Sequence, residues 1–263
     1  ERVNGDTMGS FLYLTGRNCC GMLCGKRGEN MKFGKFLADC ESENRTVRIV
    51  ALGDSVTEGC FGLVDEDIHT AKDPKAAYHQ ILRKKLLGVF PELTLEIINA
   101  GIGGTRAEEG LLRLEKDVLV YQPDLVIVCF GLNDGGEGRK AYIPSLRGIF
   151  ERLQQENIQV IFMTPNMMNT RLDDRIQPQS LRDYALVTMN RQNNGEMDEM
   201  MADAEGLCRE MQVPLCNCYD KWKQLSACGV DTTALLANYI NHPTREMHAL
   251  FADSLFDCLL FDK

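Results

Sequence analysis

A serine with the surroundings of a reactive group stands at the end of the stretch VRIVALGDSVTEGC, residues 47–60. A run of β-branched and aliphatic residues stops at Gly53-Asp54-Ser55, which is typical of a buried strand that ends in a tight turn. A serine hydroxyl is a poor nucleophile at neutral pH unless an adjacent base removes its proton. Ser55 is therefore either a nucleophile or a helix cap, and this stretch alone favours the cap.

Three other segments could supply chemistry beside Ser55. They are NAGIGGTR at 99–106, GLNDGG at 131–136 and the His242-Pro243 pair. The glycines of 99–106 do not form the G-x-G-x-x-G dinucleotide motif, because Arg106 stands where the last glycine is required. Ser55 does not lie in the G-x-S-x-G elbow of α/β-hydrolases either. Taken singly, Gly104 and Asn133 are best explained as turn residues.

The elements that must position these residues follow from hydrophobic periodicity. From residue 47 onward short apolar runs alternate with segments of helical period, which predicts an α/β fold in which helices cover a parallel sheet. We expect five strands, at 47–52, 94–98, 125–130, 159–163 and 213–216. Ligands bind at the carboxyl ends of such strands, so the loops that carry the polar residues are expected to open on one edge.

The remaining segments are assigned by composition. Residues 1–46 are expected to form an N-terminal arm with a short helix in NMKFGKFLADC, and residues 47–263 to form one domain. The polar stretch 166–193 is expected to be a loop or a lid over a site. The last helix is expected at 243–261, with Pro243 at its first position.

Four blocks in order, GDSVTEG, NAGIGGT, GLND and NHP, resemble those of the SGNH (GDSL-type) hydrolase family over roughly residues 47–255. The resemblance implies a flavodoxin-like, three-layer α/β/α fold with a five-stranded parallel sheet. It also implies that Ser55 is the nucleophile and His242 the general base. The oxyanion hole would consist of the Ser55 and Gly104 backbone N–H groups and the Asn133 side-chain amide, a kind of donor worth about 3 kcal/mol.

One position departs from the family pattern. The family places an aspartate three residues before the histidine, where this chain has Tyr239, and a tyrosine cannot neutralise an imidazolium as a carboxylate does. The orienting group would then be a backbone carbonyl in NYINH, the Asn238 side chain, or a carboxylate elsewhere such as Asp231 or Asp220. We expect a Ser55–His242 dyad with backbone support, and expect Asp54 to order the serine turn.

The function that this resemblance implies is a serine esterase that works through an acyl-enzyme without metal or organic cofactor. A small acyl group, acetyl on a carbohydrate, is the leading substrate. Hydrolysis of lysophospholipids or acyl thioesters is the alternative within the same class. A non-catalytic carbohydrate- or partner-binding domain, disarmed by the loss of the acid at position 239, is the alternative from another class.

Composition bounds the partners and the location. A formal net charge of -9 argues against nucleic acid, and no apolar run approaches the roughly 18 to 20 residues that span a bilayer. No signal peptide is visible, and eleven scattered cysteines favour free thiols in a reducing cytoplasm. Neither Cys19, Cys20 and Cys24 nor the Cys216/Cys218 pair has zinc-site spacing. The oligomeric state stays open.

The remaining polar candidates are interpreted as structural. His69 is expected in a solvated loop, with a place near the site as the alternative, and His248 is expected at the surface or boundary of the last helix. For Arg106, next to the glycine loop, a surface salt bridge is favoured, and contact with a substrate is the alternative.

Overall fold

The computed structural model of the protein describes residues 33–63 and 70–261. Its centre is a five-stranded parallel sheet with the strand order β4-β1-β5-β6-β7. The strands are β1 Val47–Gly53, β4 Leu95–Gly101, β5 Leu125–Cys129, β6 Gln159–Met163 and β7 Leu215–Cys216. All five predicted strands are present within a few residues of their expected bounds, which confirms the α/β fold.

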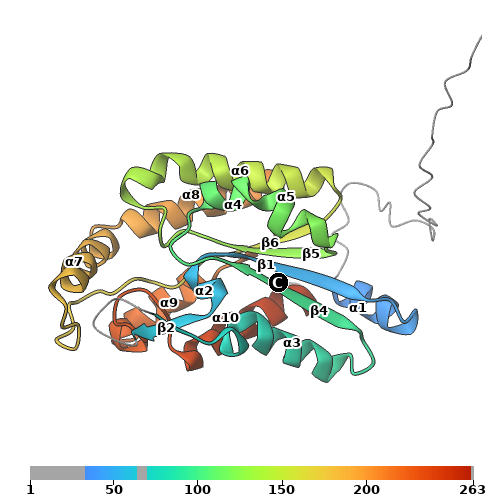
Figure 1. Ribbon diagram of the computed structural model, residues 1–263, viewed down its shortest axis with the longest axis horizontal. Coiled ribbons are helices and arrows are strands. Elements are labelled where there is room, and N and C mark those ends of the chain that lie inside the picture. Colours follow the sequence, from blue (N-terminus) through green and yellow to red (C-terminus); the bar gives the residue numbers. More distant parts are fainter. Residues whose placement is uncertain (1–32, 64–69, 262–263) are drawn as a thin grey trace, which may run out of the picture. The chain divides into compact units, whose positions relative to one another are not determined.

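Helices cover both faces of this sheet (Figure 1). Helices α4, α5, α6 and α8 lie on one face, and α1, α3, α9 and α10 lie on the other. Their bounds are α1 Phe33–Ser42, α3 Tyr78–Val89, α4 Ala107–Leu112, α5 Leu114–Asp117, α6 Arg139–Gln155, α8 Glu196–Met211, α9 Cys218–Ala227 and α10 Arg245–Leu260. A sheet covered on both faces explains why β5 is buried throughout and has no alternating polar positions.

Short elements complete the described chain. Helix α2, Ser55–Glu58, follows β1 directly, and a small antiparallel hairpin follows α2. The hairpin strands are β2 Cys60–Leu63 and β3 Thr70–Lys72, and single 3-10 turns lie at Pro74–Ala76, Leu119–Tyr121, Gly136–Gly138 and Thr232–Leu235. Sequence periodicity does not predict the hairpin, because its strands are too short to show an alternation.

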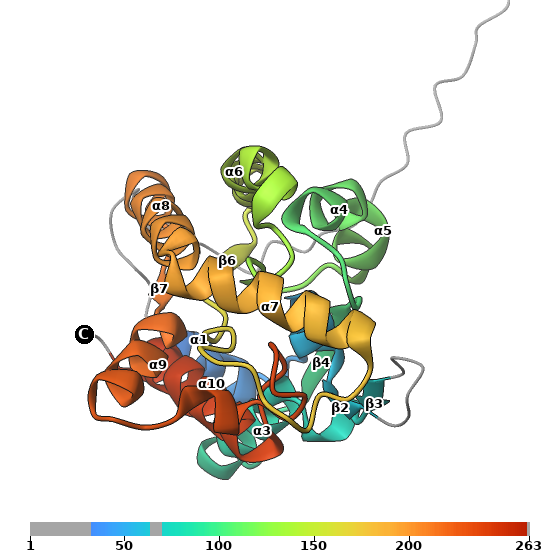
Figure 2. The ribbon, with the colours of Figure 1, turned by 90° about the vertical axis from the view of Figure 1, so that its left-hand side faces the viewer.

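The strand order brings the serine turn and two other loops together. Strand β1 pairs with β4 on one side and with β5 on the other, so that Gly53 lies opposite both Gly101 and Cys129. From β1 the next strand of this sheet along the chain, β4, is added on one side, and all later strands are added on the other side. Ligands of open α/β sheets bind at the point where the strand order switches in this way. Figure 2 looks onto this edge of the sheet, with helix α7, Gln179–Asn193, crossing in front of it.

The expectation of a loop or lid over 166–193 is right for its first half and wrong for its second, because residues 166–178 form no helix or strand whereas 179–193 are helical. Residues 163–169 are buried, and α7 occupies the last 15 residues of the stretch. Two polar side chains of the helix bond inside the fold: Thr188 donates to the Asn169 side chain at 2.7 Å, and Gln192 accepts from the Met168 N–H at 2.9 Å. Because polar residues of the helix bond inside the fold, polarity does not distinguish α7 from the loop that precedes it.

The last helix begins later than the sequence indicates. Thr244 caps it by accepting a hydrogen bond from the Met247 N–H, so the first helical residue is Arg245. Pro243 instead pairs with Leu236 in an isolated bridge. The residues around His242 are therefore fixed by their own contacts and not by the helix.

The predicted arm at 1–46 is described only from residue 33. Helix α1 confirms the helix expected in this segment. Its buried residues Phe36, Leu37 and Cys40 belong to the same hydrophobic core as the sheet. The boundary at residue 46 stays a prediction, and residues 1–32 lie outside the described part of the chain.

Candidate active site

Ser55 is the first residue of α2 and is held there by its neighbour. The Asp54 carboxylate accepts the Val56 N–H at 2.9 Å, as expected for an aspartate that orders this turn. Gly53 leaves no room for a side chain, since an added Cβ would lie 2.2 Å from the Thr57 hydroxyl oxygen and 2.6 Å from the Cys129 carbonyl oxygen. The end of β1 thus packs directly against α2 and the end of β5, which fixes the position of Ser55.

His242 meets Ser55 across 187 residues of sequence. Its Nε2 lies 2.9 Å from the Ser55 Oγ, and its Nδ1 lies 3.0 Å from the main-chain carbonyl oxygen of Phe61. A carbonyl only accepts, so Nδ1 carries the hydrogen and Nε2 is left to accept from the serine hydroxyl. Both residues are buried, with 6% and 8% of their surfaces exposed.

The charge state of His242 fits a proton acceptor. Burial lowers the pKa of His242, while the bond to the Phe61 carbonyl and the charge of Glu58 raise it in part. The net direction is downward, which keeps the imidazole neutral at neutral pH. A neutral imidazole bonded to a serine hydroxyl is the arrangement that general-base catalysis requires.

The loop before His242 is stabilised by Asn238. The Asn238 side-chain oxygen accepts three main-chain N–H groups, from Ile240 at 3.0 Å and from Asn241 and His242 at 2.9 Å. Asn238 therefore fixes the backbone that carries His242, and its contact is with the His242 N–H, not with the ring.

Tyr239, which replaces the family aspartate, turns toward other partners. Its φ of 58° lies in the left-handed region, and the Arg175 guanidinium stacks 3.8 Å from its ring centroid. Tyr239 also packs against a small cluster that includes Ile176 and Leu181. Tyr239 therefore packs beside α7, which carries Leu181, and is not a hydrogen-bond partner of the imidazole.

The carboxylates considered as a replacement acid have other partners. Asp231 accepts the Thr233 N–H at 3.1 Å and pairs with Arg171 at 2.6 Å. Asp220 accepts from the Gln224 side chain at 2.6 Å. The expected backbone support is present, but the carbonyl belongs to Phe61 of the hairpin and not to the NYINH segment.

We predict that Asp231→Asn leaves kcat for an acetyl ester within about twofold of wild type, because this half-exposed carboxylate pairs with Arg171. The measurement is steady-state hydrolysis of p-nitrophenyl acetate. A loss as large as that of His242→Ala would show that Asp231 acts on the histidine.

Donors for a developing oxyanion come from three loops. The main-chain N–H groups of Ser55 and Gly104 donate to no other group within the described residues. Gly104 has a φ of +77°, which favours glycine. The Asn133 amide donates to the Thr105 carbonyl at 3.0 Å and keeps a second N–H hydrogen. This bond ties the loop after β5 to the loop that carries Gly104.

Two buried carboxyls lie behind these loops. Burial raises the pKa of Asp54 to about 7, and the charge of Asp134 raises it further, against the bond from Val56. Burial likewise raises the pKa of Asp134 to about 6, although the Ala107 N–H bonds to it at 2.8 Å. One oxygen of each carboxyl, Oδ2, has no hydrogen-bond partner in the described structure. Protonation relieves the cost of burying two neighbouring charges.

Asp54→Asn is predicted to change how stability depends on pH. Because the folded protein holds the Asp54 proton more tightly than the unfolded chain, the stability that this carboxyl contributes is complete below about pH 4 and is lost as the pH rises through about 7. Asparagine can still accept from Val56 and does not titrate. The free energy of unfolding of wild type minus that of the variant should therefore fall by on the order of 1–4 kcal/mol between pH 4 and pH 8.

Urea unfolding at several pH values measures this difference. The exposed Asp203→Asn is the control and should follow the wild type throughout. A difference between wild type and Asp54→Asn that stays constant with pH would contradict the prediction.

The other histidines have structural partners. His248 is fully buried, contrary to expectation: its Nδ1 accepts the Tyr78 N–H at 3.0 Å, and its ring packs on Phe61, with the ring centroids 4.8 Å apart. His79 bonds to the Thr57 carbonyl oxygen at 3.1 Å. His69 lies outside the described residues. Both described side chains support the turn and the hairpin around Ser55 and His242.

Arg106 also differs from expectation. Its Nε donates to the main-chain carbonyl of Asn133 at 3.2 Å, so it braces the Asn133 loop where a surface salt bridge was expected.

Among the described residues no group of three or more His, Cys, Asp or Glu side chains is arranged to hold a metal. The Cys216 and Cys218 sulfurs lie 3.7 Å apart in the core, and Cys19, Cys20 and Cys24 lie outside the described residues. No helix in the described ranges combines the length and the hydropathy that crossing a membrane requires.

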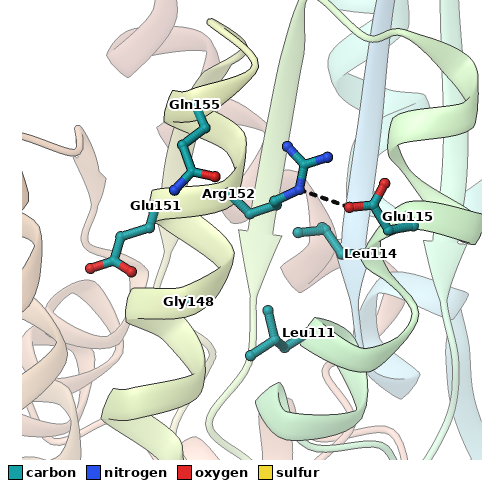
Figure 3. A pocket seen from close by; sticks show the side chains of 7 residues that line it. All are labelled: Leu111, Leu114, Glu115, Gly148, Glu151, Arg152 and Gln155. Carbon is teal, nitrogen blue, oxygen red and sulfur yellow. Dashed lines mark hydrogen bonds and ion pairs between the residues drawn. The ribbon is translucent and has the colours of Figure 1, made fainter.

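A pocket elsewhere on the molecule contains none of the predicted site residues. It lies between α4–α5 and α6, beside an ion pair in which Arg152 donates to Glu115 at 2.7 Å (Figure 3). Its lining residues are Leu111, Leu114, Glu115, Gly148, Glu151, Arg152 and Gln155.

The Phe61 carbonyl and Glu58 are the site groups that sequence reasoning missed. A main-chain carbonyl leaves no signal in residue type. Glu58 is visible in the sequence as the second acidic residue of GDSVTEG. Its role could not be predicted, because its partners lie farther along the chain, in β3 and in the loop after β4.

Several known proteins are similar to this chain. An acetylxylan esterase of Geobacillus stearothermophilus is 29% identical over 33% of this chain and 39% of its own length. An uncharacterized lipoprotein, YqeF, of Bacillus subtilis (strain 168) is 32% identical over 41% of this chain and 52% of its own length. The matches thus span about half or less of these curated relatives.

Solved structures share the fold. A two-domain esterase active on acetylated mannans, crystallised with mannopentaose, superposes with a TM-score of 0.62 at 22% identity, over 86% of this chain and 52% of the other. A catalytic mutant of the Geobacillus stearothermophilus acetylxylan esterase Axe2 gives a TM-score of 0.61 at 18% identity, over 82% and 95% of the two chains.

A family comparison covers most of the domain. Residues 51–250 match the model of the GDSL-like Lipase/Acylhydrolase family, a range that includes the serine turn, the glycine and asparagine loops and the His242 loop. With the shared fold and the four blocks in order, this match agrees with the resemblance seen in the sequence. The chain belongs to the GDSL-like Lipase/Acylhydrolase family.

Proposed function

We propose that this protein is a serine esterase that removes short acyl groups, above all acetyl, from a carbohydrate. The observation that carries the proposal is the hydrogen bond between Ser55 Oγ and His242 Nε2 at 2.9 Å, with the Phe61 carbonyl on the opposite ring nitrogen. A hydroxyl next to a correctly oriented neutral imidazole is an activated nucleophile.

Acylation begins when the Ser55 oxygen attacks the ester carbonyl carbon and its proton passes to His242 Nε2. The negative charge that develops on the carbonyl oxygen is stabilised by the Ser55 and Gly104 N–H groups and by the second N–H of Asn133. When the intermediate collapses, the bond to the alcohol breaks and His242 gives the proton to the leaving oxygen. The product is an ester of Ser55.

Deacylation repeats these steps with water. His242 takes a proton from the water, the hydroxyl attacks the Ser55 ester, and the proton returns to the Ser55 oxygen as the acid leaves. In this scheme Asp54 caps α2 and Asn238 holds the His242 loop, so both act on geometry and neither touches the substrate. The scheme consists of nucleophilic attack by Ser55 and by water and of proton transfers through His242, so it calls on no cofactor.

The choice of acyl group rests on the relatives. An acetylxylan esterase and an esterase active on acetylated mannans are both similar to this chain. Acetyl esters of polysaccharides are therefore the substrates to test first, and longer acyl esters are the rival.

The test compares acetyl and octanoyl p-nitrophenyl esters, followed by acetate release from acetylated xylan and mannan oligosaccharides. We expect a higher kcat/KM for the acetyl ester and Ser55-dependent acetate release. Preference for the octanoyl ester would favour a lysophospholipase- or thioesterase-type enzyme. Calorimetric binding of the oligosaccharide by wild type without any turnover would favour a binding domain.

The cytoplasmic location stays a prediction. It is supported by the free thiols of buried residues such as Cys129 and Cys208. One relative is described as a lipoprotein, which makes fractionation of the cells the direct test.

A further inference from the structure

Glu58, the last residue of α2, lies between the serine turn and the loop after β4. Its Oε2 accepts the Gly103 N–H at 2.8 Å and lies 3.5 Å from the Cys60 sulfur. Its Oε1 pairs with Lys72 of the hairpin. The side chain is largely buried, with 21% of its surface exposed. One carboxylate thus bonds to three segments around Ser55.

The main chain of Glu58 contacts the same loop. Its carbonyl oxygen accepts from the Asn99 side chain at 3.2 Å, and an added Cβ on Gly101 would lie 2.2 Å from the Glu58 nitrogen. An added Cβ on Gly103 would lie 3.7 Å from the Ser55 Cβ, so the loop adjoins the serine. Glu58 therefore holds the segment that leads into Gly104 against α2.

No charged group bonds directly to the His242 ring in the described structure, so a nearby carboxylate could stabilise the imidazolium form. The Phe61 carbonyl orients the ring but carries no net charge, so it cannot neutralise an imidazolium as the family aspartate would. The Glu58 carboxylate adjoins the Ser55–His242 pair, because an added Cβ on Gly103 would lie 2.9 Å from Glu58 Oε2 and 3.7 Å from the Ser55 Cβ, and the Ser55 Oγ bonds to His242. Burial lowers the pKa of His242 on balance, and the charge of Glu58 acts in the opposite direction. Although burial raises the pKa of Glu58 itself, the bonds from Lys72 and Gly103 outweigh burial and lower it, so Glu58 is ionised at neutral pH.

The other charged or titratable groups around His242 come from α10, from the serine turn and from β3. On α10, His248 is kept neutral by burial, which lowers its pKa to about 3. Arg245 on the same helix pairs with Asp73 at 3.3 Å and stacks 4.4 Å from the Phe61 ring centroid. Asp54, beside Ser55, is buried with a raised pKa. Lys72 acts on the site chiefly through its pairing with Glu58.

We propose that Glu58 is a positioning residue of this site: its charge supports the imidazolium that forms when His242 takes the Ser55 proton, and its bond to Gly103 holds the loop that presents the Gly104 N–H. The proposal rests on the proposed function. No bond to Glu58 forms or breaks, since the proton moves from Ser55 Oγ to His242 Nε2 while Oγ bonds to the acyl carbon.

Two variants that change charge in opposite directions test this role. Glu58→Gln still has an oxygen that accepts from Gly103 but has no charge, so the acid limb of kcat/KM should move to lower pH by about 0.5–1 unit and kcat should fall about 3- to 30-fold with little change in KM. Lys72→Met removes the partner cation, which leaves more of the Glu58 charge to act on His242. Its acid limb should move to higher pH.

Glu96→Gln is the matched control. Like Glu58, Glu96 is a glutamate in an ion pair, but it pairs with Arg48 across β1 and β4 and is exposed. Its pH profile should coincide with that of wild type. Acid limbs of Glu58→Gln and Lys72→Met that do not move, or that move in the same direction, would overturn the proposal. If Glu58→Gln does not fold, the direction of the Lys72→Met shift decides, since Lys72 is more than half exposed.

The Ser55→Ala variant separates this proposal from the proposed function. If Ser55→Ala keeps wild-type activity, the esterase scheme itself fails. If Ser55→Ala is inactive while the Glu58 and Lys72 variants keep the wild-type profile, the esterase scheme stands and only the role of Glu58 falls.

Discussion

Replacing Ser55 with alanine is expected to lower kcat for p-nitrophenyl acetate by at least about four orders of magnitude. The variant loses the oxygen that attacks the acyl carbon and keeps only binding and the oxyanion donors. The site should otherwise persist, because Ser55 makes its side-chain bond to His242 alone within the described residues.

His242→Ala is the companion variant. If Ser55 and His242 act as one unit, it should lose about as much activity as Ser55→Ala, and the double variant should be no slower than either single one. Circular dichroism and thermal melting establish that the variants are folded. A Ser55→Ala rate within tenfold of wild type would mean that another residue performs the hydrolysis.

Asn133→Ala is expected to lower kcat about 10²- to 10³-fold while KM changes little. The amide hydrogen that does not bond to Thr105 is available to the oxyanion, which has its full charge only in the transition state. Steady-state kinetics on the acetyl ester separate the two constants.

Asn193→Ala is the matched control for Asn133. Its exposed amide also donates to a main-chain carbonyl, that of Thr170 at 2.9 Å, but it stands at the end of α7. It should retain wild-type kcat. A rise in KM without a fall in kcat for Asn133→Ala would assign Asn133 to substrate binding and remove it from the oxyanion hole.

The sheet and the shared edge of the loops after its strands follow from local signals in the sequence. Apolar runs of strand length mark all five strands, and in a parallel sheet the loops after them must share one edge. Ser55, Gly104 and Asn133 lie in the loops that directly follow β1, β4 and β5, so the sequence places them together. His242 is separated from β7 by α9 and the Thr232–Leu235 turn, and its pairing with Ser55 is what the family resemblance implies.

Other features depend on contacts that residue type does not reveal. The carbonyl that orients His242 is a main-chain group of a short hairpin, and any residue at position 61 would offer the same oxygen. The sequence pattern does not predict helix α7, because some of its polar residues are bonded inside the fold and not exposed to solvent. Gln192, for example, donates to the Tyr219 hydroxyl. Pro243 resembles a helix start, but Thr244 is the cap.

The central claim is that Ser55 is an activated nucleophile, and labelling with a fluorophosphonate probe tests it most directly. Wild type, Ser55→Ala and His242→Ala would each be treated with the probe, and the modified peptide identified by mass spectrometry. We predict labelling at Ser55 in the wild type and none at this position in either variant. Folded wild type that remains unlabelled, or that is labelled at a different residue, would contradict the claim.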